Sequence, residues 1–186
     1  MHALLADARF YELLTKFDAD LAAQVRAKGC VWCGGRLHSA CYGRKPRGAP
    51  IELGPAYEKR FSLCCERDGC RRRATPPSVR FFGRRVYLGM TFVLVMAMSC
   101  GLGVRRTARL HAELGVGLRT LRRWRKWWLE VFVESQLWRR ERARFMPPVD
   151  ESELPAALIE RFARDGPNEQ LLAVLSFLSP LTTRTA

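Results

Sequence analysis

The residues best suited to chemistry are cysteines, of which the chain has seven. Cys30 and Cys33 form a CxxC pair that is followed by two glycines. Two thiolates at this spacing in a tight turn can bind one Zn²⁺, and the glycines let backbone amides face the sulfurs. In a reducing compartment clustered thiols are more often metal ligands than disulfides. The segment therefore predicts one half of a zinc site.

The other half offers three cysteines for two positions, because Cys64 and Cys65 are adjacent and Cys70 follows them. In an extended segment Phe61, Leu63 and Cys65 share one face, and Cys64 lies on the other. We therefore predict Cys65 as the ligand, with Cys64 as the alternative. The predicted cofactor is Zn²⁺, and its four predicted ligands are Cys30, Cys33, Cys65 and Cys70.

The remaining thiols and imidazoles are weaker candidates. His38 and Cys41 lie in the 31 residues between the two cysteine pairs, a stretch interpreted as a hairpin insertion, and could replace a ligand or form a second site. A polar strand residue is the simpler interpretation of His38, and Cys100 is predicted to be a small buried residue. A closed four-cysteine site supports folding and not catalysis. Since the sequence shows no set of catalytic residues elsewhere, we expect no enzymatic activity.

The charge is strongly basic and unevenly placed. The 186 residues carry a net charge of +14. Residues 71–128 hold 14 basic side chains and one acidic one, Glu113. All of these basic side chains except Lys126 are Arg, which favours bidentate recognition of phosphate or guanine. Nucleic acid is therefore the first expected partner and an anionic membrane the second. The charged N-terminal segment has no secretory pattern, so we expect a cytoplasmic, nucleoid-associated protein.

The elements that must position these residues are mainly helical. Apolar residues at threes and fours predict a helix over residues 3–27, and residues 29–77 have the texture of short strands around a metal. Residues 86–104 are uncharged and long enough for a membrane span. Their glycines and the equal Arg flanks on both sides favour a buried helix over residues 84–100 instead.

Helices are also predicted over residues 104–114 and 118–145, with a turn at 115–117, and two shorter ones over 153–164 and 168–178. The predicted fold is mainly α with a small β zinc ribbon. It comprises an N-terminal helix (1–28), a zinc ribbon (29–77), a trihelical helix-turn-helix with a long last helix (84–146) and C-terminal helices (150–186).

Residues 105–124 have the spacing of a helix-turn-helix, with Gly115 at the turn. On the second helix Leu121, Trp124, Trp128 and Val131 form the predicted buried stripe, and the other tryptophans at helical spacing, Trp127 and Trp138, are also assigned to packing. The opposite face is cationic, and no acidic residue occurs between Glu113 and Glu130 to pair with it. Double-stranded DNA is therefore the predicted partner. The predicted contacts are Arg105, Arg106, Arg119, Thr120, Arg122, Arg123 and Lys126, with Arg71, Arg72 and Arg73 beside the second cysteine pair. Further backbone contacts are predicted for Arg44, Lys45, Arg47, Arg80, Arg84 and Arg85.

The cysteine pairs, the segment from Phe61 to Arg73 and the helix-turn-helix together resemble the N-terminal DNA-recognition region of zinc-ribbon transposases from bacterial insertion sequences. The resemblance covers about residues 28–130. In that family a ribonuclease-H-like catalytic domain follows, whereas here about 40 residues follow the long helix. The resemblance implies a targeting module without the nuclease: an accessory or regulatory protein of a mobile element, with a transposase or recombinase subunit as a partner.

Three other functions remain open. The apolar and acidic C-terminal helices could recruit a protein partner, which would make the chain a scaffold or a transcription regulator unrelated to transposition. The basic surface could bind structured RNA. A membrane-associated basic protein would depend on residues 86–104 being a span.

Overall fold

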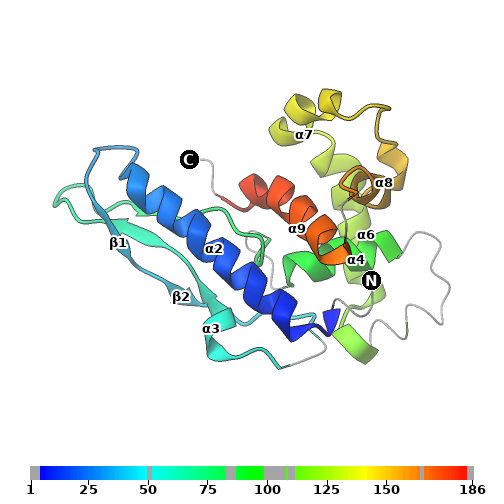
Figure 1. Cartoon of the computed structure of the whole chain (residues 1–186), viewed down its shortest axis with the longest axis horizontal. Helices are drawn as coiled ribbons and strands as arrows, with labels where there is room; N and C mark the ends of the chain where they lie inside the picture. The colour runs from blue at the N-terminus through cyan, green and yellow to red at the C-terminus, as the bar shows by residue number, and fades with distance from the viewer. Residues whose placement is uncertain are drawn as a thin grey trace.

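The computed structural model describes residues 5–49, 52–82, 87–98, 108, 112–163 and 166–183. The fold is mostly helical, with a few short antiparallel strands. Figure 1 shows the strands along one flank of the long helix α2 (Ala8–Lys28), with the other long helices gathered toward the opposite side. Those helices are α4 (Gly89–Met98), α6 (Leu118–Lys126) and α9 (Pro167–Leu178).

Helix α2 confirms the predicted N-terminal helix and leads directly into the first cysteine pair. It begins after Asp7, whose side chain accepts a hydrogen bond from the Arg9 backbone N–H at 3.0 Å. It ends at Gly29, whose φ of 75° suits glycine and breaks the helical backbone. Its buried face includes Phe10, Leu14 and Asp18.

The strands form two small antiparallel sheets. The three-stranded sheet has the order β1-β4-β5, and a separate pair joins β2 to β3. Within β4, Leu63 and Cys65 are buried whereas Cys64 is only partly covered, as the alternation predicted. The bounds are β1 Leu37–Ser39, β2 Tyr42–Gly43, β3 Lys59–Arg60, β4 Leu63–Cys65 and β5 Arg73–Ala74, with the short helix α3 at Pro55–Glu58.

Helix α4 is the predicted core helix, but it begins at Gly89, later than predicted, because Tyr87 and Leu88 form β-bridges with Arg47 and Phe81. The site is tight, because a Cβ on Gly89 would lie 3.0 Å from the Val79 carbonyl oxygen. All side chains from Met90 to Met96 are buried. Within the described part of the chain, no helix is both long and apolar enough to cross a membrane. Residues 83–86 and 99–107, which include Arg84, Arg85, Cys100, Arg105 and Arg106, lie outside the described residues.

Aromatic rings dominate the packing between α4 and α6. Phe92 stacks on Trp128 with ring centroids 5.4 Å apart and meets the edges of Trp124 and Trp127. Trp138 is also buried, so the assignment of these four tryptophans to packing is confirmed. The same apolar cluster includes side chains of α2 and α9.

The prediction of one continuous helix over residues 118–145 is wrong. After α6 the chain forms a π-helical turn at Trp127–Phe132, and Ser135 then caps a separate helix, α7 (Gln136–Glu141), by accepting the Trp138 backbone N–H at 3.2 Å. The π-helical turn shifts the helical register. Phe132 is therefore buried, while Val131, assigned to the buried stripe, is 52% exposed.

The C-terminal helices belong to the core. The helix predicted over residues 153–164 is shorter: a 3₁₀ turn at Glu151–Glu153 comes first, and the short helix α8 (Ala156–Glu160) follows after Pro155. Helix α9 matches its prediction, and its residues Leu171, Val174, Leu175 and Leu178 are buried in the main cluster. The apolar face suggested for a partner is therefore covered by the chain itself.

Arg80 corrects another expectation. It was predicted to contact the DNA backbone, but its side chain is fully buried and paired with Asp18. A buried, paired guanidinium has no access to a phosphate.

Candidate functional site

The first knuckle (residues 30–35) is a tight turn directly after α2. The Gly34 backbone N–H donates to the Cys30 carbonyl at 2.8 Å, and the Cys30 N–H donates to the Gly35 carbonyl at 2.9 Å. Gly35 has no room for a side chain, because a Cβ there would lie 3.0 Å from the Cys65 Sγ and 3.4 Å from the Cys33 Sγ. Glycine at this position lets the turn approach the sulfurs closely.

The second knuckle (residues 65–72) turns between β4 and β5. The Cys65 N–H donates to the Arg72 carbonyl at 3.0 Å, and the Cys70 N–H donates to the Arg67 carbonyl at 3.1 Å. Gly69, with φ 84°, makes the turn possible. β4 and β5 thus hold Cys65 and Cys70 facing the first knuckle.

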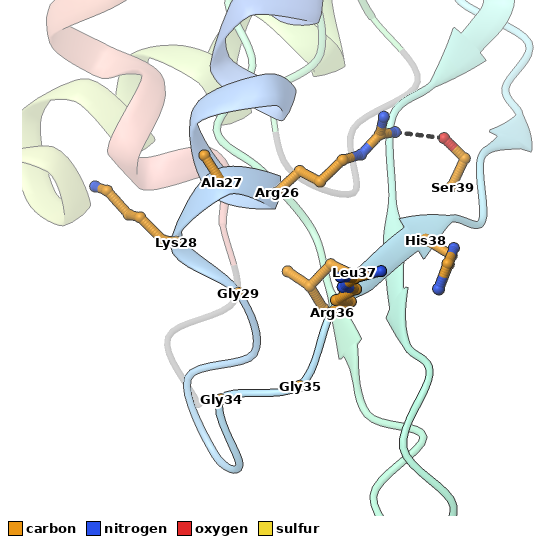
Figure 2. A pocket seen from close by; sticks show the side chains of 10 residues that line it. All are labelled: Arg26, Ala27, Lys28, Gly29, Gly34, Gly35, Arg36, Leu37, His38 and Ser39. Carbon is orange, nitrogen blue, oxygen red and sulfur yellow. Dashed lines mark hydrogen bonds between the residues drawn. The ribbon is translucent and has the colours of Figure 1, made fainter.

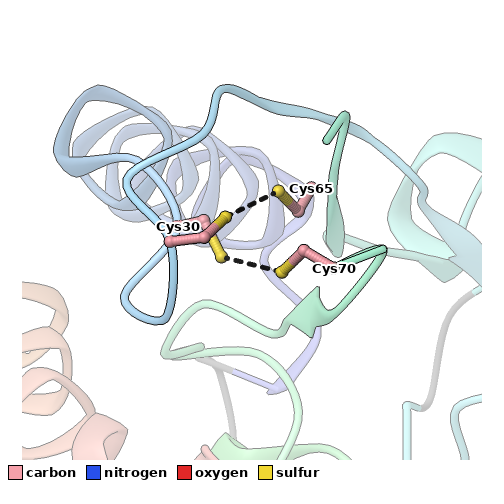
Figure 3. A group of neighbouring side chains, drawn as sticks. Cys30, Cys65 and Cys70 are labelled. Atoms are coloured by element: carbon pink, nitrogen blue, oxygen red, sulfur yellow. Dashed lines mark hydrogen bonds between the residues drawn. The ribbon is translucent and has the colours of Figure 1, made fainter. Parts of the chain in front are cut away.

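The two knuckles bring four sulfurs together. The Sγ atoms of Cys30, Cys33, Cys65 and Cys70 all lie within 4.8 Å of one another. The Sγ atoms of Cys30 and Cys70 are 3.7 Å apart, and those of Cys33 and Cys65 are 3.4 Å apart. Figure 3 shows Cys65 and Cys70 facing the knuckle of Cys30. In a tetrahedral site with metal–sulfur bonds of about 2.3 Å, neighbouring sulfurs are about 3.8 Å apart. The cluster therefore has the composition and spacing to hold a metal ion, as predicted.

Backbone amides donate to two of the sulfurs, and the pKa of the two thiols shifts in opposite directions. The Trp32 N–H donates to the Cys30 sulfur and lowers the pKa of that thiol to about 7. The Arg67 N–H likewise favours the Cys65 thiolate, but burial and the neighbouring thiols outweigh it and raise the pKa of Cys65 to about 12. A bound cation would hold both as thiolates, so metal binding must release protons.

The alternative ligands lie outside the cluster. Cys64 directs its sulfur toward the Arg71 carbonyl, 3.4 Å away, and Cys41 is 4.0 Å from the Ser62 carbonyl. The His38 ring nitrogen Nε2 lies 2.8 Å from Glu66 Oε2 at the surface. His38 is thus a polar strand residue, which was its simpler interpretation.

A second candidate surface lies on α6. Leu121 and Trp124 of this helix are buried. Its cationic face comprises the exposed side chains of Arg119, Arg122, Arg123 and Lys126. Lys126 pairs with Glu130 at 3.5 Å, whereas the three arginines form no ion pair with any described residue. Thr120, also a predicted contact, is partly exposed on the same helix.

The other elements of the predicted helix-turn-helix are only partly described. Residues 101–107 and 109–111 lie outside the described residues, while Ala108 and residues 112–114 are helical. Gly115, with φ 62°, and Gly117, which precedes α6, form the turn where it was predicted.

Other predicted cations stand near the cysteines or in the insertion. Arg71, Arg72 and Arg73 are all exposed, and Arg71 lies 3.5 Å from Asp68. In the insertion Lys45 and Arg47 are exposed, and Arg44 lies over the Phe81 ring.

Sequence reasoning missed Trp32. This residue is exposed at the tip of the first knuckle, where the Arg72 guanidinium lies 5.0 Å from its ring centre. The available signal was its position between two metal-ligand cysteines: a side chain there is directed outward, because the sulfurs fill the inside of the turn.

A pocket of about 540 Å³ lies beside the first knuckle, where α2 ends against β1. Its basic lining residues are Arg26, Lys28 and Arg36. Arg26 donates to the Ser39 hydroxyl at 2.7 Å, and the Lys28 side chain points away from the Arg26 side chain (Figure 2). Arg26 and Lys28 point in different directions, so these two cations do not converge on one anion (Figure 2).

No protein-family model, curated protein or solved structure matches the chain.

Proposed function

We propose that the chain is a DNA-binding protein in which the four-cysteine cluster holds one structural Zn²⁺ and the cationic face of α6 contacts duplex DNA. The observation that carries the proposal is the division of α6 into two sides. Leu121 and Trp124 fix the helix against the core, and the exposed arginines opposite have no carboxylate partner among the described residues. Phosphates and base edges are the groups that complete such a helix face.

The proposed role of the metal is structural. Four thiolates complete a tetrahedral Zn²⁺ site and leave no open coordination position for a substrate. The ion would tie the end of α2 to β4 and β5 and so fix the strands next to Arg71, Arg72 and Arg73. These arginines are proposed to contact phosphates and position the duplex.

A more specific biological role is supported by the motif resemblance alone. The cysteine spacing and the turn before α6 resemble the recognition region of insertion-sequence transposases. We therefore propose an accessory or regulatory protein of a mobile element that acts with a transposase or recombinase subunit.

The test is duplex DNA affinity against salt concentration, on protein whose metal content has been measured. If three to four of the proposed cations contact phosphates and the others contact bases or solvent, the logarithm of the binding constant should fall with the logarithm of salt concentration with a slope of about −3. The proposal also expects close to one zinc per chain. Full zinc without duplex binding would refute the DNA proposal and leave the cluster as a structural element only.

A further inference from the structure

The tip of the first knuckle exposes two apolar side chains that the fold does not use. Val31 is 81% exposed and Trp32 is 44% exposed. By contrast, Trp124, Trp128 and Trp138 are buried. Trp is enriched at protein interfaces relative to the rest of the surface, so an exposed Trp beside an exposed Val is a candidate contact surface.

The Trp32 ring is held in place from across the cysteine cluster. The Arg72 guanidinium, 5.0 Å from the ring centre, belongs to the second knuckle, whereas Trp32 belongs to the first. The Arg67 side chain adds a second link by donating to the Cys33 carbonyl at 2.9 Å. The indole is therefore preorganised, so a partner that stacks on it pays little entropy for ordering it.

The charge around the tip selects the class of partner. Residues 26–36 and 64–73 hold seven basic and two acidic side chains. Both acidic groups already have partners: Glu66 lies 2.8 Å from His38, and Asp68 lies 3.5 Å from Arg71. A fitting partner is thus polyanionic and also offers flat apolar faces. A nucleic acid with unpaired bases has both properties, whereas the bases of an intact duplex are stacked on each other.

We infer that the knuckle tip is a base-stacking platform that takes an unpaired nucleotide of single-stranded nucleic acid, with the base on Trp32 and phosphates near Arg72 and Arg73. This inference rests on the proposed nucleic-acid function: the phosphates proposed to contact Arg72 and Arg73 are those of the unpaired nucleotide, next to the duplex that α6 contacts. It assigns the chain to DNA that is partly opened, such as a frayed end or a junction, or to RNA with single-stranded segments.

The test compares Trp32→Leu with Trp32→Phe in the full, metal-loaded chain. Leucine keeps an apolar side chain without a π face, and phenylalanine restores the face. The probes are a thymidine and a uridine oligonucleotide of about 16 nucleotides and a blunt duplex. Trp32→Leu should weaken single-strand binding by roughly 5- to 150-fold, the range for the loss of one stacked base. Trp32→Phe should recover most of the loss, and duplex affinity should change less than about threefold. A stronger effect with one of the two oligonucleotides decides between DNA and RNA.

Several results would overturn the inference. If both variants bind the single strands like the unmodified protein while the duplex is still bound, the platform is wrong and the proposed function stands. If the unmodified protein binds neither single strand nor duplex, both fail. Trp32-dependent binding of poly-glutamate in place of the oligonucleotides would assign the tip to an acidic protein partner. Metal content of each variant shows whether the knuckle is intact, and the substituted side chain is exposed, so both variants should fold.

Discussion

Asp18 on α2 and Arg80, just before α4, form an ion pair in which both side chains are fully buried, with Arg80 Nε 2.8 Å from Asp18 Oδ2. Asp18 also accepts hydrogen bonds from the Ser78 hydroxyl at 2.6 Å and the Val79 N–H at 2.7 Å. Arg80 donates to two backbone carbonyls at 2.8 Å. The pair joins α2 to the chain between the strands and α4, and through it the metal half of the molecule to the helical half.

The first prediction follows from this pair. Asp18→Asn removes the carboxylate charge and leaves the buried Arg80 guanidinium without compensation, so the free energy of unfolding should fall by about 3–5 kcal/mol. Asp20→Asn, at an exposed position of the same helix, is the matched control and should change it by less than about 0.5 kcal/mol. Urea unfolding of the two variants measures both values. Equal stabilities would show that the pair does not hold the fold together.

The second prediction concerns the adjacent thiols of β4. Cys65→Ser removes a sulfur from the cluster and should abolish stoichiometric metal binding. Cys64→Ser changes a sulfur that faces a backbone carbonyl and should retain it. Metal analysis after dialysis against a weak chelator separates the two variants. The reverse pattern would make Cys64 the ligand.

A third prediction concerns the turn around the cluster. Gly35→Ala adds a Cβ at 3.0 Å from the Cys65 Sγ. Because this contact is too close, the two knuckles must move apart, and metal retention should weaken. Gly43→Ala is the control, since a Cβ there has no neighbour within 4 Å. Competition with a chromogenic chelator gives the relative metal affinities. Equal retention in both variants would mean that the knuckles can separate at no cost.

The fourth prediction is a loss of stability in alkali. Burial raises the pKa of Tyr11 and Tyr57 above the ordinary value, so the folded state keeps the protons that the unfolded state releases. These groups leave the free energy of unfolding unchanged below pH ~10. As pH rises further, the free energy of unfolding should fall by up to about 1.4 kcal/mol per pH unit for each tyrosine.

Tyr57→Phe isolates one of the two groups. The Tyr57 hydroxyl has no hydrogen-bond partner among the described residues, so the variant should match the unmodified protein at pH 8 within about 1 kcal/mol. Above pH ~10 the free energy of unfolding of this variant should fall less steeply with pH than that of the unmodified protein. Unfolding curves at pH 8 and at alkaline pH provide the comparison, and identical slopes would show that Tyr57 is not protected from titration.

The sequence predicted the features that depend on local spacing. The CxxC turn, Gly29 at the end of α2 and the alternation that selects Cys65 over Cys64 all act within a few residues, and the structure has them. The amphipathic pattern of α6 likewise identified the buried Leu121 and Trp124.

Features set by distant contacts were not predicted. Arg80 is buried because it pairs with Asp18 of α2. The two residues are 62 positions apart in the sequence, so no local pattern reveals the pairing. The π-helical turn at Trp127–Phe132 places Val131 outside, while Trp128 packs on Phe92 of α4 and Phe132 packs on Trp128 and Trp138. Trp32 was missed because apolar residues are expected inside a fold, and only the geometry of the knuckle directs this one outward.

The most direct test of the central claim is duplex DNA affinity for two double variants of equal charge. Arg122→Ala with Arg123→Ala removes two cations from the cationic face of α6. Arg139→Ala with Arg140→Ala removes two from α7, where each pairs with a glutamate. If α6 contacts the duplex, the first variant should lose at least about tenfold in affinity and show a shallower salt slope, while the second stays close to the unmodified protein. Equal affinities for both variants would show that charge alone attracts DNA and that α6 is not its binding surface.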